Sequence, residues 1–521
     1  MKGLCYNGSE KLNVNGEIEI MKCMRKQKYI INFILIILSI GMILLNLFFV
    51  DMPRWIGAVL MLAISGLGVL LWIGKKKLVL NIVMTVVNVL TLIIVFVGVY
   101  CNPYWNSISF RKNVDYYCLN YDEVITYEDA LCDLDYAMKH LEESHPLFIS
   151  GLSDDMEALY ETARENLKSY ERITTNILCK EIQQIFSSMG DGHTYIFANF
   201  QDYHYLKHRY NHDTAGDVLV GINNRSIEEL FEEKKALFSY ETENYGMNRL
   251  KSYLSTVEDL DYLGINLENG IIYTYETAEG ERVDCTYYRE DFVTYDEYMT
   301  FNNITDTSQE NEDYEFVSYE VIPECDLAVL VLYSCNYNDE YKECLKSMFT
   351  EVKEKGINNV CVDLRNNGGG NSLVANEFIR YLDINTYKSW GQDWRLGPFI
   401  INSKGNTINN ERNQELLFTG NVYALTSVFT YSSAMDFAML LTDNNLGTII
   451  GEASGNRPGS YGDITVFKLQ KSGLVMQVST KKWYRVDTDC LDEFIEPDIK
   501  CESGQALEVL KLTCKEKGYI D

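Results

Sequence analysis

The sequence predicts an α/β unit with an N-terminal helical subdomain, preceded by three transmembrane helices. Nearly all the long uninterrupted apolar runs fall in the first hundred of the 521 residues. Helical apolar spacing follows them, and from Asp326 short buried-strand runs alternate with helices, which favours a largely parallel sheet. A chain of this length exceeds what one hydrophobic core organises, so we expect more than one unit.

Three apolar runs make up the predicted membrane segment, residues 29–100: Tyr29–Val50, Trp55–Ile73 and Leu78–Tyr100. At about 1.5 Å per helical residue, runs of this length cross a hydrocarbon core of roughly 30 Å. A cleaved signal peptide is the alternative for the first run. Its apolar length and the two runs that follow directly favour membrane spans instead.

Lysine and arginine indicate the orientation of these spans. They gather before the first run and between the second and third, at Lys22, Arg25, Lys26, Lys28 and Lys75–Lys77. Because such loops stay in the cytoplasm, residues 1–28 are predicted to be cytoplasmic, and the chain after Tyr100 extracytoplasmic. We therefore expect a multi-pass protein of the cell membrane.

The exported part is predicted to contain four segments. They are a linker at 101–122, a helical subdomain at 123–199, a middle region at 200–320 and a catalytic core at 321–521. Helices are expected at Tyr127–His145, twice within Asp154–Met189, and at Ile227–Leu237, Leu373–Leu382 and Ala434–Leu441. Strands are expected at Leu327–Tyr333, Val360–Leu364, Val422–Leu425 and Gly447–Gly451.

Composition excludes some classes of function. The formal net charge of −29 argues against a nucleic-acid partner, which needs a basic face to neutralise phosphates. The fourteen cysteines include no CxxC pair and no spacing with histidine typical of zinc sites. Each cysteine is therefore interpreted as a small buried hydrophobe. We expect no metal and no cofactor.

Two turns that follow predicted strands offer candidate chemistry. The first, Asp363–Gly370, ends in three consecutive glycines, which let backbone N–H groups approach a ligand closely. It lacks the GxxxxGK[ST] pattern of a phosphate cradle, and a loop without function is its alternative. The second, Thr430–Asp436, places serines at the positive end of a helix, which suits a nucleophile with an oxyanion intermediate. A capping box between Ser433 and Asp436 is the alternative there.

A nucleophilic serine needs a base, and the sequence has six histidines. His193 is the best candidate, because it lies in a glycine turn between a helix and a strand-like run. His145 precedes Pro146 at a helix end, where a structural role is expected. His204, His208 and His212 are spaced by four, but Asn211, Asp213 and the lack of a helical apolar face argue against a metal site.

Taken together, these motifs resemble the tail-specific (C-terminal processing) serine protease family, near its branch of the tricorn core and interphotoreceptor retinoid-binding protein. Four motifs occur in the family's order over about 310 residues: Asp191–Thr194, Asp363–Gly370, Thr430–Ala434 with Ile450–Glu452, and Glu496–Asp498. The resemblance implies a crotonase-like ββα-type protease core. Ala215–Leu219 with Ile222–Asn224 also resemble the end of a PDZ-like segment, shortened here.

The resemblance implies roles for single residues. Ser433 matches the nucleophile, with Ser432 as the second choice, and His193 matches the general base. The N–H groups of Gly369 and Ala434 match the oxyanion hole.

The chain also departs from the family's pattern in two places. The processing proteases use a lysine downstream of the serine, but no lysine occurs between Ser433 and Lys468, which favours His193. In the tricorn branch a serine precedes the histidine, but Gly192 stands there. Glu496 is the candidate for the orienting acid, with a structural role before Pro497 as its alternative.

The sequence thus predicts a membrane-anchored extracytoplasmic serine peptidase acting on peptides or unfolded protein. A catalytically inactive relative that binds peptides or hydrophobic ligands is the first alternative. A membrane sensor is the second, although the short cytoplasmic segments contain no signalling domain. The sequence does not indicate the oligomeric state.

Overall fold

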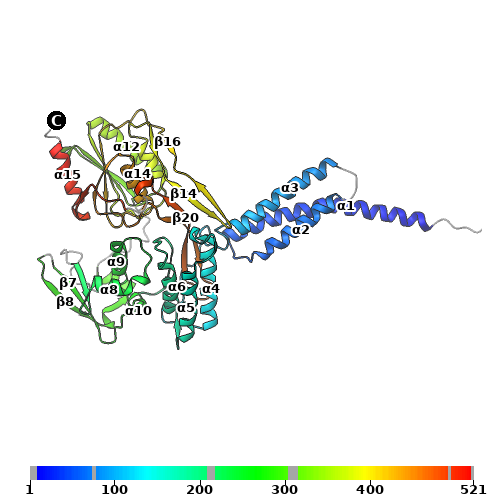
Figure 1. The fold of residues 1–521 in the computed structure, drawn as a ribbon, viewed down its shortest axis with the longest axis horizontal. Coiled ribbons are helices and arrows are strands. Elements are labelled where there is room, and N and C mark those ends of the chain that lie inside the picture. Colours follow the sequence, from blue (N-terminus) through cyan, green and yellow to red (C-terminus); the bar gives the residue numbers. More distant parts are fainter. Residues whose placement is uncertain are drawn as a thin grey trace, which may run out of the picture. The chain divides into compact units, whose positions relative to one another are not determined.

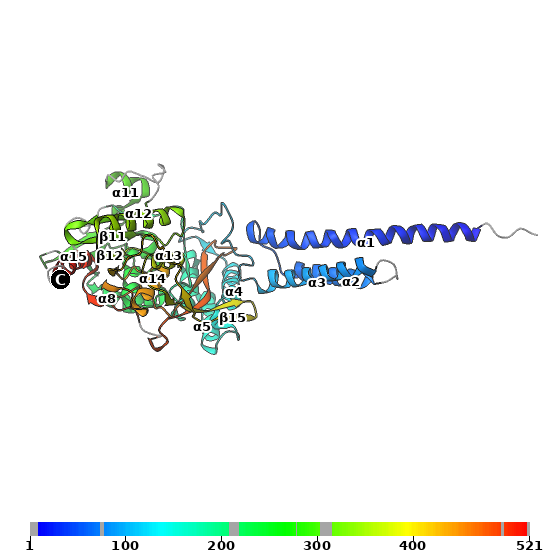
Figure 2. The same ribbon diagram turned by 90° about the horizontal axis from the view of Figure 1, so that it is seen from above.

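The computed structural model describes residues 9–72, 78–207, 218–277, 279–302, 315–490 and 494–517. The chain divides into two compact units (Figures 1 and 2). The first comprises Met1–Asp115, Leu396–Phe399 and Thr465–Phe467, and the second comprises Tyr116–Arg395, Ile400–Ile464 and Lys468–Asp521.

The first unit contains the helices α1 (Ser9–Phe48), α2 (Trp55–Leu71) and α3 (Leu78–Phe96), the last extended by a π-helical turn, Val97–Cys101. Length and composition allow two of these helices to cross a membrane, at Gln27–Phe48 and Leu78–Cys101. The prediction of three spans is therefore wrong in number. The second apolar helix begins only after Pro53 and Arg54 and has 17 residues, which is short for a span.

Polar contacts join α1 and α3 within this apolar unit. The Asn32 side-chain amide donates to Asn88 Oδ1 at 2.7 Å, and the Tyr29 hydroxyl donates to Asn81 Oδ1 at 2.6 Å. Buried polar groups on apolar helices need such partners, and they fix which faces of the two helices meet.

The second unit begins with the predicted helical subdomain, which contains α4 (Tyr127–Ser144), α5 (Asp154–Ser169) and α6 (Thr175–Ser187). Each helix starts at a hydroxyl residue, Thr126, Ser153 or Thr174, whose side chain accepts a hydrogen bond from a backbone N–H in the first turn. The sequence prediction of three helices here is confirmed.

The middle region has a four-stranded antiparallel sheet in the order β6-β5-β7-β8. The strands are β5 (Val218–Ile222), β6 (Arg225–Ser226), β7 (Ile271–Glu276) and β8 (Arg282–Tyr287). The helices of this region are α8 (Ile227–Lys234), α9 (Glu243–Ser252), α10 (Val257–Tyr262) and α11 (Tyr295–Phe301). A separate strand pair joins β4 (His204–Leu206) to β9 (Phe292–Thr294). The start of the expected PDZ-like motif, Ala215–Asp217, and also His208 and His212 lie outside the described residues.

The catalytic core is built on a six-stranded sheet in the order β10-β11-β12-β17-β18-β21. All neighbours are parallel except β10 and β11. The strands are β10 (Val317–Ile322), β11 (Leu327–Leu332), β12 (Asn359–Asp363), β17 (Asn421–Thr426), β18 (Thr448–Gly451) and β21 (Ile499–Lys500). Each strand expected in this part of the chain is present, and so is the largely parallel sheet.

Helices cover both faces of this sheet. One hydrophobic cluster buries apolar side chains of α12 (Asp339–Lys355), α13 (Leu373–Ile379) and α14 (Ser433–Asp443) against the strands. A second cluster contains Ala506, Leu510 and Cys514 of α15 (Ala506–Lys517). Strand side chains alternate between the two clusters, so both faces are buried, as parallel sheets require.

A second sheet connects the histidine motif to the core. Its order is β15-β14-β20-β19, and β3 (Tyr195–Phe197) also pairs with β20 (Val475–Tyr484). The other strands are β14 (Gly391–Leu396), β15 (Phe399–Ser403) and β19 (Tyr461–Lys468). Because β3 begins two residues after His193, its antiparallel pairing with Val475–Gln477 fixes the histidine loop to the core.

Candidate active site

The two turns singled out in the sequence meet at one edge of the parallel sheet. Strands β12 and β17 are parallel neighbours, so their following loops leave from the same edge. A β-carbon built on Gly369 would lie 2.6 Å from the Ser432 β-carbon and 2.9 Å from the Ser433 nitrogen. The Tyr431 N–H donates to Asn367 O at 3.0 Å. The glycine turn therefore packs directly against the serine turn.

Ser432 adopts a strained backbone conformation, with φ 54° and ψ −126°. Such a conformation costs about 1–3 kcal/mol in a residue other than glycine and persists only where the surroundings enforce it. Here the Ser432 N–H donates to Asn456 Oδ1 at 2.8 Å. Ser432 is the N-cap residue of α14, but its side chain makes no capping bond. A strained turn from strand to helix is the geometry that exposes a nucleophilic serine in other hydrolases.

Ser433, the first choice from the sequence, has a different environment. It is the first residue of α14 and only 5% exposed. Its hydroxyl lies 2.8 Å from Gly370 O, to which it donates, and 2.9 Å from Ser372 Oγ. Ser372 in turn donates to Asp436 Oδ2 at 2.9 Å. The capping box between Ser433 and Asp436 is also absent, since Ser433 lies inside the helix and Ser432 occupies the N-cap position. Ser433 thus has a bonded hydroxyl, whereas Ser432 is partly exposed, lines the pocket and has the strained backbone.

The two N–H groups that the resemblance assigns to the oxyanion hole are hydrogen-bonded within their own loops. The Gly369 N–H donates to Asn367 Oδ1 at 2.8 Å, and the Ala434 N–H donates to Tyr431 O at 3.1 Å. Both are engaged because each closes a tight turn within its own loop. The N–H groups of Gly370 and Ser433 have no acceptor within the described ranges, and both residues line the pocket beside Ser432.

His193 lines the same pocket as the two serines. Its ring centroid lies 4.8 Å from that of Tyr431, and neither ring nitrogen has a hydrogen-bond partner among the residues that the structure describes. Burial lowers the pKa of His193 below its usual value, against the charge of Asp191, which raises it. The imidazole is therefore neutral near pH 7 and available as a base.

Asp191, a residue without a predicted role, holds the histidine loop in place. Its Oδ1 accepts from the His193 N–H at 2.8 Å, and its Oδ2 contacts His145 at 3.1 Å, Thr194 at 2.5 Å and Ser479 at 2.7 Å. Burial alone would raise the pKa of Asp191, but these bonds and the charge of His145 lower it to about 2. The position of Asp191 within the Asp-Gly-His-Thr motif is the signal that could have identified it.

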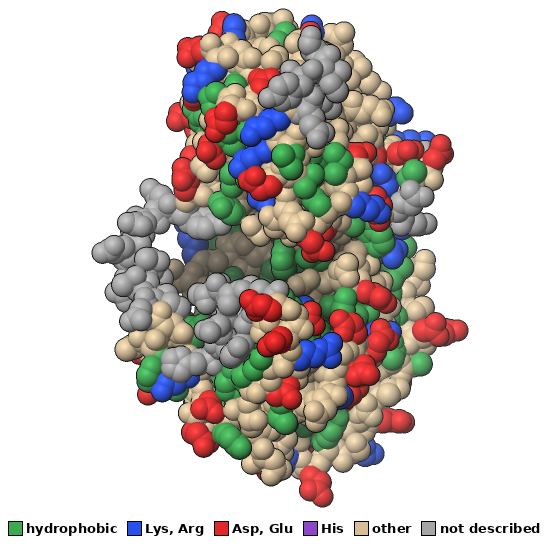
Figure 3. All heavy atoms as spheres, turned by 90° about the vertical axis from the view of Figure 1, so that its left-hand side faces the viewer, with side chains coloured by type: hydrophobic (Ala, Val, Ile, Leu, Met, Phe, Trp, Pro, Cys, Tyr) green, Lys and Arg blue, Asp and Glu red, His purple; other side chains and the backbone are tan. Residues whose placement is uncertain are grey.

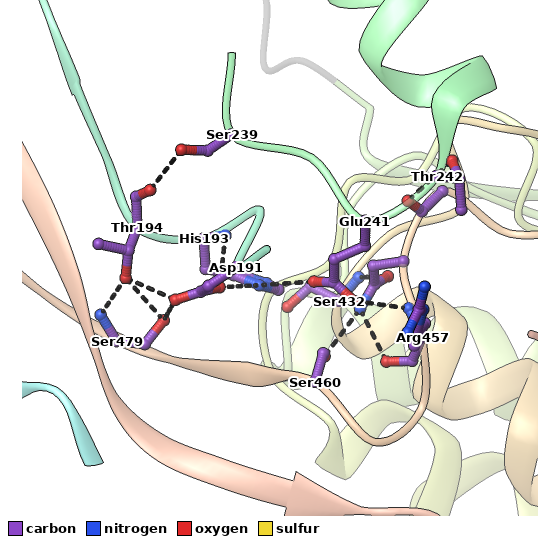
Figure 4. Close-up of polar contacts among 12 residues, drawn as sticks. Asp191, His193, Thr194, Ser239, Glu241, Thr242, Ser432, Arg457, Ser460 and Ser479 are labelled. Atoms are coloured by element: carbon purple, nitrogen blue, oxygen red, sulfur yellow. Dashed lines mark hydrogen bonds and ion pairs between the residues drawn. The ribbon is translucent and has the colours of Figure 1, made fainter. Parts of the chain in front are cut away.

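Glu241 enters the site from the middle region, just before α9 (Figure 4). Its Oε2 accepts from the Arg457 N–H at 2.8 Å, whereas Oε1 has no partner among the described residues and lies 4.0 Å from His193 Nδ1. Burial raises the pKa of Glu241 to about 8. No motif surrounds this residue in the sequence, so sequence reasoning missed it.

Glu496, predicted to orient the histidine, lies elsewhere. Its side chain is 57% exposed and pairs with Lys500 at 2.7 Å, four residues along the chain. It does not line the pocket that contains His193 and the serines. The structure thus places Glu496 in an exposed ion pair outside the pocket.

The pocket has a volume of about 740 Å³. Its lining is mainly aromatic and polar, and includes Tyr195, Tyr245, Trp390, Tyr461 and Trp483. A cavity of this size accommodates several residues of a peptide. Figure 3 shows another view of the surface, hollowed between two lobes, with acidic side chains distributed over both lobes.

Asp191, His193 and Glu241 are the described residues that could together hold a metal ion, since their ligand atoms all lie within 4.8 Å of one another. Both oxygens of Asp191 already accept hydrogen bonds from protein groups. A metal would have to displace those bonds, so the three residues fit proton transfer better than metal coordination.

A parallel sheet with a serine on a strained turn and a buried neutral histidine in one pocket defines the class of serine hydrolases. Residues 326–501 match the family model described as Peptidase family S41, so this part of the chain is similar to that family of serine peptidases. The resemblance noted in the sequence is thereby confirmed.

The solved structures of CPAF are similar to this chain in fold. Mature CPAF is 11% identical to this chain with a TM-score of 0.53, and the match covers 75% of this chain and 97% of CPAF. Mature CPAF in complex with lactacystin is also 11% identical, with a TM-score of 0.52, and that match covers 75% of this chain and 98% of the other. The photosystem II D1 C-terminal processing protease is 14% identical with a TM-score of 0.39, and the match covers 74% of this chain and 97% of that protease. No curated protein matches the chain.

Proposed function

We propose that this protein is a membrane-anchored peptidase in which Ser432 is the nucleophile and His193 the general base. The strained backbone of Ser432 carries this proposal. Its surroundings hold a conformation that costs free energy, which is expected where presenting the side chain serves a function. Ser433 is the neighbouring residue whose hydroxyl supports the turn.

In the proposed reaction His193 Nε2 takes the proton from Ser432 Oγ as that oxygen attacks the carbonyl carbon of a peptide bond. The resulting oxyanion accepts hydrogen bonds from the Gly370 and Ser433 N–H groups. The histidine then gives its proton to the leaving amine, and an acyl-enzyme forms on Ser432. Water, activated by the same histidine, releases the peptide and restores the serine.

A serine–lysine mechanism has no support in this site. Arg457 lies in the loop after β18, the region in which the processing proteases carry their lysine. Its backbone N–H is bonded to Glu241, and its guanidinium lies 4.9 Å from the ring centroid of Phe494. The base role therefore goes to His193.

Labelling of the full-length protein in native membranes with a fluorophosphonate probe tests the assignment. We expect labelling of the wild type and of Ser433→Ala at a reduced rate, and no labelling of Ser432→Ala or His193→Ala. Labelling lost in Ser433→Ala but retained in Ser432→Ala would reverse the assignment of the two serines. An unlabelled but folded wild type would favour the inactive peptide-binding alternative.

We further propose that the peptidase unit is extracytoplasmic, on the basis of the positive charges that flank the apolar helices. Cys132 offers a test, because it is a free, exposed thiol in the peptidase unit. A membrane-impermeant maleimide should label intact cells that carry the wild type, and Cys132→Ser should lower that labelling. Labelling of Cys132 only after permeabilisation would contradict this orientation.

A further inference from the structure

Four buried polar atoms without a hydrogen-bond partner gather around the candidate base. They are both ring nitrogens of His193, Oε1 of Glu241 and the hydroxyl oxygen of Tyr431. Each is unpartnered within the described part of the chain, although burying such an atom without a hydrogen bond normally destabilises a fold. A cluster of such unpartnered atoms is typical of a functional site, where the groups form hydrogen bonds with a substrate or with each other during the reaction.

Glu241 is held at this point from two sides. Its Oε2 accepts from the Arg457 N–H at 2.8 Å, and the Gly192 N–H bonds to the same carboxyl. These contacts join the loop after β18, the histidine loop and the segment before α9. The second oxygen, Oε1, is left facing His193 Nδ1 at 4.0 Å. A small rotation of either side chain would bring the two atoms within hydrogen-bond distance.

Asp191 is the competing partner for His193 Nδ1, at 3.9 Å. It is less free to serve, because hydrogen bonds to His193 N–H, Thr194 and Ser479 fix its two oxygens in place. Glu241 Oε1 can move toward the ring without breaking any bond described here. Catalytic hydrogen bonds are often long in the free enzyme and shorten when substrate binds.

We propose that Glu241 is the positioning residue that orients His193 for proton transfer from Ser432. This inference rests on the proposed function of that pair. In the active form, His193 Nδ1–H donates to Glu241 Oε1, which leaves the Nε2 lone pair free to take the serine proton. The carboxylate then stabilises the imidazolium that forms, while the proton on Nδ1 stays there throughout.

The ionisation of Glu241 controls which tautomer of His193 is present. When Glu241 is protonated, its O–H donates to Nδ1, the ring proton sits on Nε2, and the base is blocked. Burial and the charge of Asp191 raise the pKa of Glu241 to about 8, whereas the N–H groups of Arg457 and Gly192 lower it. Asp463 also acts on His193, by raising its pKa. Reactivity should therefore rise with pH up to about 8.

The test is the second-order rate constant for fluorophosphonate labelling as a function of pH, in the full-length protein. In Glu241→Gln the amide oxygen can keep the hydrogen bond from the Arg457 N–H, so the NH2 group faces Nδ1 and donates to it at every pH, as the protonated acid does. We expect its rate at high pH to fall about 100-fold, because the charge that stabilises the imidazolium is lost. We also expect the rise of the labelling rate with pH, which ends near pH 8 in the wild type, to move below the usual histidine pKa of about 6.5.

Two variants serve as matched controls. Glu243→Gln changes an exposed acid two residues away, and Glu496→Gln changes the acid expected from the sequence. Both should keep the wild-type rate and pH profile. In Glu241→Ala, added formate should restore part of the rate, which a purely structural role of Glu241 would not allow.

This inference would be overturned if Glu241→Gln showed the wild-type labelling rate and pH dependence while Ser432→Ala was unreactive. The proposed function would remain intact in that case. Absence of rescue by formate in a folded Glu241→Ala variant would also overturn the inference. Labelling that persists in Ser432→Ala would instead mark the failure of the proposed function itself.

Discussion

The hydroxyl of Tyr431 occupies the space in which a side chain on Gly192 would begin. A β-carbon built at residue 192 would overlap the tyrosine oxygen and lie 3.3 Å from Tyr431 Cζ. The tyrosine ring also stacks on Tyr245, with centroids 4.7 Å apart and an interplanar angle of 21°, so it cannot easily withdraw. This relationship explains why the residue before His193 is glycine in this chain.

Gly192→Ala should therefore displace Tyr431 or the histidine loop and reduce fluorophosphonate labelling by about 10-fold or more, a loss of over 1 kcal/mol. Adding Tyr431→Phe removes the overlapping oxygen and should restore part of the labelling. The double-mutant cycle measures this coupling. Strictly additive effects of the two substitutions would contradict it.

Gly369→Ala should abolish labelling of Ser432. The residue has φ 105°, which favours glycine, and its new β-carbon would meet Ser432 and Ser433 within 2.9 Å. The neighbouring Gly368→Ala is a matched control, since its β-carbon meets nothing within 4 Å. Equal labelling of the two variants, measured alongside their unfolding midpoints, would show that the glycine turn does not support the serine.

Glu241 should also make stability depend on pH. Its pKa is about 8 in the folded chain, above the ordinary glutamate value. Its contribution to stability is thus complete below about pH 4.3 and is lost as pH rises through 8. Glu241→Gln cannot ionise, so its thermal midpoint should fall less steeply between about pH 5 and pH 8. Parallel slopes for the two proteins, followed by intrinsic fluorescence, would argue against a buried, protonated Glu241.

Asp191→Asn should destabilise the fold and remove activity together. The substitution removes the charge that pairs with buried His145 and breaks part of the hydrogen-bond set with Thr194 and Ser479. Loss of one partner from such a buried pair costs about 3 kcal/mol or more. Asp202→Asn, at an exposed position, should leave the unfolding midpoint unchanged. Similar midpoints for both variants would refute this role for Asp191.

Much of the core could be predicted from the sequence, because its signals are local. Strand runs such as Leu327–Leu332 are continuously apolar, and the helix before Pro146 ends where the proline requires. The length of α2 was overestimated, because apolar composition continues beyond its last helical residue, Leu71.

The site was predicted less completely, because several of its determinants are not local. Motif matching placed the nucleophile near Ser432 and Ser433, but only the backbone angle at Ser432 distinguishes them. Glu241 lies about fifty residues from His193 along the chain and carries no motif. Glu496, by contrast, matched a motif yet faces solvent. Such roles depend on contacts between segments that are far apart in the sequence, and the spacing of residues along the chain does not predict those contacts.

Glu241 and Tyr245 come from a part of the chain that lies between the histidine and the serine in sequence. A nascent chain reaches His193 first, then Glu241, and Ser432 last. None of these segments forms the pocket by itself, and its lining also includes Trp483, so the pocket is complete only once synthesis has passed that residue and the segments have docked. Under the proposed function, this order of residues along the chain would delay proteolysis until the pocket is complete and so protect the unfinished protein from its own activity.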